Sequence, residues 1–145
     1  MSVEIARIEC MFDNVVAIDP TADESVLVER IAELELLKSA AAAGQARAAQ
    51  LWMPLAGSAE AAAGVPAARR GRGVASEIAL ARRDSPARGG RHLGFAKALV
   101  YEMPHTLAAL EAGVLSEWRA TLIVRESACL DVDDRRTLDS EYAAT

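Results

Sequence analysis

The sequence predicts an all-α fold of about six helices. Alanine supplies 31 of the 145 residues and aromatic residues only 4%, and such a composition favours helices and close helix contacts over sheets. Apolar residues recur at intervals of three and four, as they do along one face of a helix. Capping residues and prolines bound these stretches. The length suits a single helical domain, residues 1–145, with residues 1–20 loosely attached.

The N-terminal third predicts a short helix and then a long one. Residues 3–14 have apolar positions at helical spacing, and Asp19-Pro20 ends that stretch. Thr21-Ala22-Asp23-Glu24 has the pattern of a capping box, so a long helix should occupy about 22–53 and end at Met53-Pro54. Its expected apolar face consists of Leu27, Ile31, Leu34, Leu37, Ala41, Gly44, Ala48 and Leu51. The small residues in the second half predict close packing against another helix.

A loop and a pair of helices are expected next. Residues 54–73 are a mixture of Ala, Gly, Pro and Arg that predicts a loop, in which Ser58 to Ala63 has room for a helical turn. Two helices should follow over about 74–102: a short one from Val74 to Arg82, and a second that begins at Pro86 after the N-cap candidates Asp84 and Ser85.

Two to three helices should complete the C-terminal part. Met103-Pro104 ends the preceding helix, and Thr106 to Ala112 predicts a short helix with Gly113 in the C′ position. Ser116 should cap the next helix, and Asp131, three residues before Asp134, should cap the last.

The charges divide the chain into acidic and basic parts. The net charge is −5, but residues 67–101 contain eight basic and two acidic residues, a net of +6, whereas residues 1–37 contain nine acidic and two basic residues. A local basic cluster can attract phosphates, because screening limits electrostatic fields to about 8–10 Å. Pairing of these bases with acids of the same chain is the alternative. The candidate nucleic-acid-binding residues are Arg69, Arg70, Arg72, Arg82, Arg83, Arg88, Arg91 and His92.

The stretch from Glu77 to Leu93 has the length of a helix-turn-helix, in which the second helix lies in the major groove of DNA. Its composition is unusual for that motif. Arg83 stands where the motif commonly turns on glycine, and Arg82 and Asp84 stand where it buries apolar residues. Gly89, Gly90 and Gly94 each cost about 1 kcal/mol in a helix interior relative to alanine. A helical hairpin with solvated arginines therefore remains the alternative.

Other kinds of site are not predicted. The sequence has no phosphate loop, nucleophile elbow or zinc-protease motif, and His92 and His105 lack neighbouring ligands at metal spacing, so we expect no metal, no cofactor, no small-molecule substrate and no catalytic residue. The aspartates at 131–134 fit helix capping better than a calcium loop. Cys10 and Cys129 are expected to be small buried residues, and Trp52 and Trp118 to fill the core. With no apolar run long enough for a membrane and no signal peptide, a cytoplasmic location is expected.

Four segments carry a resemblance to a known family. They are 74–81 (VASEIALA), 96–104 (AKALVYEMP), 106–113 (TLAALEAG) and 115–120 (LSEWRA). From about Glu33 to Glu141 the chain resembles the actinobacterial domain of unknown function 222, in particular the mycobacterial 13E12 repeat proteins. In that family, which is associated with mobile elements, the helical region commonly precedes an HNH endonuclease module. The family supplies no agreed catalytic residue in this region. Since the sequence stops at Thr145 and contains no HNH histidines or cysteine pairs, we expect the chain not to be that nuclease by itself.

Two functions follow from these observations. One is a non-catalytic module that holds duplex DNA through the basic segment. The other is an interaction module, in which the small-residue face at 38–51 pairs with a second copy or with an HNH-bearing relative, and no nucleic acid is bound.

Overall fold

The structure, a computed structural model, describes residues 10–143. These residues form helices and the turns between them, with no strand, so the predicted all-α class is confirmed. The chain divides into two compact units, Met1–Glu35 and Leu36–Thr145. One domain over residues 1–145 therefore remains a prediction.

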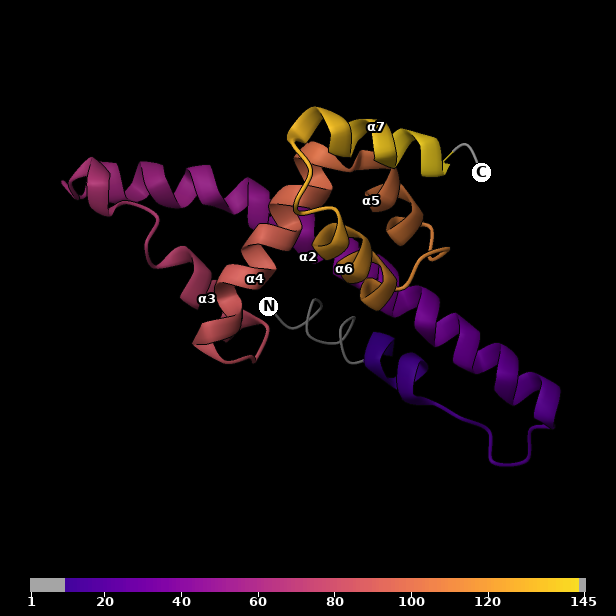
Figure 1. Cartoon of the computed structure of the whole chain (residues 1–145). Helices are drawn as coiled ribbons and strands as arrows, with labels where there is room; N and C mark the ends of the chain where they lie inside the picture. The colour runs from indigo at the N-terminus through magenta and orange to yellow at the C-terminus, as the bar shows by residue number, and fades with distance from the viewer. Residues whose placement is uncertain (1–9, 144–145) are drawn as a thin grey trace. The chain divides into compact units, whose positions relative to one another are not determined.

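Six α-helices are labelled in order in Figure 1. They are α2 (Glu24–Ala62), α3 (Val74–Ala81), α4 (Pro86–Lys97), α5 (Pro104–Glu111), α6 (Glu117–Glu126) and α7 (Val132–Ala143). A 3-10 helix (Ala67–Arg69) precedes α3, and a π-helical turn (Ala98–Glu102) extends α4. Within the described part of the chain, no helix is long and apolar enough to cross a membrane.

In the first unit, residues 10–16 are helical, while residues 3–9 of the predicted short helix lie outside the described residues. The Arg30 guanidinium donates a hydrogen bond to the Val15 carbonyl at 2.9 Å. The predicted capping box at Thr21 is wrong. The Thr21 hydroxyl donates to Asp19 instead, and the Asp23 carboxylate caps α2 by accepting from the Val26 amide at 3.0 Å.

The predicted end of the long helix at Met53 is also wrong, because α2 continues through Pro54 to Ala62. Proline removes one backbone hydrogen bond, but the residues after it are mostly alanine, leucine and glutamate, which favour helix. The Ser58 hydroxyl also donates to the Pro54 carbonyl at 2.9 Å. The predicted loop 54–73 is therefore confined to the residues after Ala62.

The core of the second unit joins all of its helices except α7. Its buried members are Ala42, Ala43, Ala46, Ala49, Val74, Ile78, Ala96, Leu99, Leu107, Leu110 and Ala120. The buried stripe of α2 is thus shifted by about one position from the apolar face that the sequence predicted, so that prediction is wrong. Ala41, Gly44, Ala48 and Leu51 are exposed, and a second stripe of alanines, which has the same spacing, meets the core. The spacing rule alone does not distinguish two adjacent stripes.

The predicted C-terminal helices are confirmed with small shifts. α5 begins at Pro104, two residues earlier than expected, because proline is well suited to the first helical position. Gly113 has a φ of +72° and follows α5 as expected for a C′ residue. The Ser116 hydroxyl accepts from the Arg119 amide at 3.3 Å, and the Asp131 carboxylate accepts from the Asp134 amide at 2.8 Å, as predicted for the two N-caps.

Candidate functional site

The basic segment is built on two helices joined by a short turn. α3 and α4 lie side by side in Figure 1, and the four residues Arg82 to Ser85 connect them. Arg83 has a φ of +56° and is the one non-glycine residue with positive φ among residues 10–143. It therefore adopts the left-handed conformation at the position where a helix-turn-helix commonly has glycine. Two helices joined by a four-residue turn thus lie where the sequence predicted them, and an arginine occupies the left-handed position.

This conformation gives a direct test of the turn. We expect Arg83→Gly to raise the free energy of unfolding by about 1 kcal/mol, because a residue with a Cβ atom pays about that much to occupy the left-handed region. Arg83→Ala removes the same charge but keeps the Cβ atom, so it should bring no such gain. Thermal denaturation of the two variants followed by circular dichroism separates the two effects. Equal shifts in both variants would contradict the backbone explanation.

A close approach of backbones fixes α4 against α3. A Cβ atom built on Gly89 would lie 1.9 Å from the Ala75 carbonyl oxygen, so no side chain larger than hydrogen fits there. Gly90 and Gly94 are different, because a Cβ atom on either one meets no atom within 4 Å. Packing against α3 therefore explains why position 89 is glycine despite its low helix propensity. Packing within the protein does not explain the glycines at positions 90 and 94.

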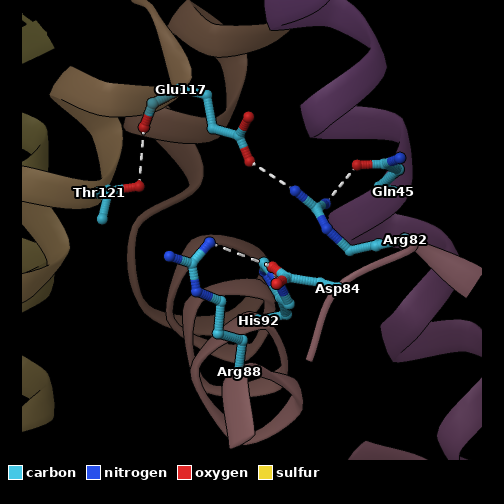
Figure 2. A network of polar contacts seen from close by, with 7 residues as sticks. All are labelled: Gln45, Arg82, Asp84, Arg88, His92, Glu117 and Thr121. Carbon is cyan, nitrogen blue, oxygen red and sulfur yellow. Dashed lines mark hydrogen bonds and ion pairs between the residues drawn. The ribbon is translucent and has the colours of Figure 1, made fainter. Parts of the chain in front are cut away.

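One of the predicted cations is held inside the protein. Figure 2 shows the Arg82 guanidinium between Gln45 of α2 and Glu117 of α6, to both of which it donates hydrogen bonds. The Arg82–Glu117 distance is 2.9 Å, and the Arg82 side chain is 22% exposed. Arg82 therefore ties α3 to two other helices and is not a free ligand for DNA.

A second part of the network involves Asp84. Its carboxylate contacts the His92 Nε2 atom at 2.9 Å and the Arg88 guanidinium at 3.5 Å (Figure 2). The hydrogen bond with His92, followed by one from the Ser85 amide, lowers the pKa of Asp84 below its ordinary value. Asp84 stands where a helix-turn-helix commonly buries an apolar residue, and it contacts two of the candidate binding residues. The Arg88 side chain nevertheless remains 62% exposed.

The other predicted residues are exposed. Arg83 and Arg91 make no side-chain hydrogen bond or ion pair within residues 10–143. Arg69 is the last residue of the 3-10 helix before α3, and Arg70 and Arg72 lie in the turn that follows it. The Arg70 Nε atom donates to the Val65 carbonyl at 2.8 Å. Three of the eight candidate residues, Arg82, Arg88 and His92, contact acids of the same chain, Glu117 or Asp84, so internal pairing accounts for part of this segment.

The exposed face of α4 combines small residues with cations. Ala87, Gly90, Arg91 and Gly94 are exposed and follow the helical repeat along the middle of this face. Arg88 lies toward one edge and Lys97 toward the other, and α4 itself contains no acidic residue. We call this surface the α4 face. Lys97 belongs to the α4 face, although the candidate residues predicted from the sequence do not include it.

An open groove of about 450 Å³ lies between α2 and α3. Ala48, Ala49, Trp52, Ile78 and Ala81 supply its apolar lining. The polar lining residues are Gln45, Glu77 and Arg82. Residue spacing along the chain does not indicate this groove, because its walls come from helices that are far apart in the sequence.

The structure also places the tryptophans and the cysteines. Trp52 packs against the core as predicted, but Trp118 is 65% exposed, so its assignment to the core is wrong. Cys10 and Cys129 are both exposed rather than buried. Among residues 10–143 the structure contains no group of three His, Cys, Asp or Glu side chains able to hold a metal ion.

Comparisons with family models, with curated proteins and with solved structures gave no match. The resemblance to the domain of unknown function 222 and its HNH-associated setting therefore remain predictions from the sequence.

Proposed function

We propose that this protein is a non-catalytic helical module that binds duplex DNA by placing the α4 face in the major groove. The groove is about 12 Å wide and a helix with its side chains measures about 10–12 Å, so a helix fits with phosphates on both sides. The observation that carries the proposal is the arrangement of the α4 face, in which small residues run between cations at both edges. Arg88 and Lys97 are placed to meet opposite phosphate backbones, and Arg91 points from the middle of the face.

Gly90 and Gly94 support the same proposal. Each lowers helix stability relative to alanine, although a methyl group at either position would meet no other atom of the protein within 4 Å. Glycine at an exposed position allows another backbone to approach closely. A DNA groove is a partner that would require such an approach and would also use the neighbouring cations.

The salt dependence of binding tests the electrostatic part of this proposal. We expect a duplex to bind at about 50 mM salt and the affinity to fall steeply as salt rises, because each phosphate contact releases counterions. Replacing Arg88, Arg91 and Lys97 by alanine should flatten the slope of log K against log salt by about 2 to 3. Fluorescence anisotropy with a labelled duplex measures both quantities.

A matched control replaces three exposed arginines of α6 and α7, Arg119, Arg125 and Arg136, by alanine. This variant changes the net charge by the same amount and should keep most of the slope. Absence of binding at about 50 mM salt, or equal losses in the two triple variants, would contradict the proposal. The double substitution of Gly90 and Gly94 by alanine adds a second readout. It should stabilise the fold and weaken DNA binding, two opposite changes that a purely structural effect would not produce.

The second function expected from the sequence is pairing through the small-residue face at 38–51. Ala42, Ala43, Ala46 and Ala49 are buried against other helices of the same chain. The small residues of the face expected from the sequence, Ala41, Gly44 and Ala48, are instead exposed, so pairing through them stays an alternative to DNA binding.

A further inference from the structure

An aspartate is fixed beside the cations of the α4 face, in the turn that precedes α4. One oxygen of the Asp84 carboxylate, Oδ1, accepts a hydrogen bond from the Ser85 amide at 2.8 Å. The other, Oδ2, contacts the His92 Nε2 atom at 2.9 Å (Figure 2). These two contacts lower the pKa of Asp84, the one with His92 most, so the carboxylate is charged near neutral pH. Both of its oxygens are thus held in place.

Arg88 is held much less firmly than Asp84. Its Nη1 atom lies 3.5 Å from the Asp84 Oδ2 atom, and Arg88 has no other side-chain partner within residues 10–143. Exposed ion pairs between residues four apart in the chain are weak. Arg82 is different, because it is mostly buried and donates to two other helices. Arg88 can therefore leave its carboxylate partner without disturbing the packing of the helices.

We propose that Asp84 competes with DNA phosphate for Arg88. The carboxylate holds the Arg88 guanidinium in the free protein, and a phosphate of the duplex takes its place on binding. The inference rests on the proposed function and assigns a residue that regulates the affinity of the same surface. A guanidinium offers the same donors to a carboxylate and to a phosphate, so one anion can replace the other.

Asp84 also opposes binding after the exchange. The Ser85 amide and His92 keep its carboxylate at the start of α4, so the carboxylate stays near the phosphate that Arg88 contacts. Two anions held close together repel each other. Asp84 thus limits how tightly this edge of the α4 face holds a DNA backbone.

Asp84→Asn tests this competition, because it removes the charge but keeps an oxygen that can accept from the Ser85 amide. We expect the affinity for a labelled duplex at about 50 mM salt to rise about fivefold. The slope of log K against log salt should become steeper by about 1, since Arg88 is then a cation without a counter-anion. Fluorescence anisotropy measures both quantities, and circular dichroism shows whether the fold is retained.

Asp133→Asn is the matched control. The Asp133 carboxylate lies 3.4 Å from the Arg136 guanidinium on α7, so this variant makes the same charge change in an exposed ion pair outside the α4 face. It should raise the affinity by about twofold or less.

The competition also requires that Asp84 act through Arg88. In a chain that already carries Arg88→Ala, Asp84→Asn should raise the affinity by only about twofold, because the side chain for which the two anions compete is absent. A general effect of charge, or a change in the fold, would give the same rise with and without Arg88.

The proposal is overturned if Asp84→Asn binds no more tightly than Asp133→Asn, or if its gain is equal in the two Arg88 backgrounds. In both cases DNA binding by the unchanged chain leaves the proposed function standing. Absence of binding by both the unchanged chain and Asp84→Asn overturns the proposed function and the competition together, so the two failures are distinguishable.

Discussion

Replacing Gly89 with alanine should destabilise the protein more than any other single methyl group added to α4. The new Cβ atom would lie 1.9 Å from the Ala75 carbonyl oxygen and 2.5 Å from the carbonyl carbon, both of them backbone atoms of α3. A backbone cannot rotate away as a side chain can, so α3 and α4 must move apart. We expect a loss of about 3 kcal/mol in the free energy of unfolding, after the gain in helix propensity is included. Chemical denaturation measures this loss.

Gly90→Ala is the matched control for this prediction. It makes the same chemical change one residue later in the same helix, where the added methyl group meets no atom within 4 Å. Alanine is favoured over glycine in a helix, so this variant should be more stable by up to about 1 kcal/mol. The two variants should thus shift stability in opposite directions. Similar effects of the two changes would mean that α3 and α4 do not cross at Gly89.

Replacing Asp139 with alanine should cost about 4 kcal/mol in the free energy of unfolding. Asp139 of α7 is 2% exposed, and its carboxylate accepts hydrogen bonds from the amides of His105 and Thr106, at 2.7 Å and 2.9 Å, and from the Thr106 hydroxyl at 2.5 Å. These amides belong to the first turn of α5, where no carbonyl of the helix itself is available. Removing the carboxylate leaves buried donors without a partner and removes an anion from the helix N-terminus. Urea denaturation gives the loss.

Asp131→Ala provides the comparison for this second prediction. Asp131 also caps a helix, since it accepts from the Asp134 amide, but it is exposed and its loss leaves that amide in water. Its replacement should therefore cost only about 1 kcal/mol. If Asp139→Ala costs no more than Asp131→Ala, then Asp139 does not join α7 to α5 as the hydrogen bonds indicate.

Much of the candidate site could be predicted from short stretches of sequence. The lengths of α3 and α4, the turn between them and the start of α4 at Pro86 depend on residues close together in the chain. Four of the candidate binding residues, Arg83, Arg88, Arg91 and His92, do lie in this turn and on α4. Arg82 has a different role, because its partners Gln45 and Glu117 are more than 30 residues away on either side. Spacing along the chain could not indicate those contacts.

The sequence by itself determined the all-α class, the caps at Ser116 and Asp131, and the left-handed glycine after α5. Each of these follows from local conformational preference, which acts over a few residues. Only the tertiary structure decided which alanine stripe of α2 is buried, why Gly89 must be glycine, and that an aspartate of α7 caps α5. These features are set by contacts between helices, and their free energies depend on atoms that the chain brings together only when it folds.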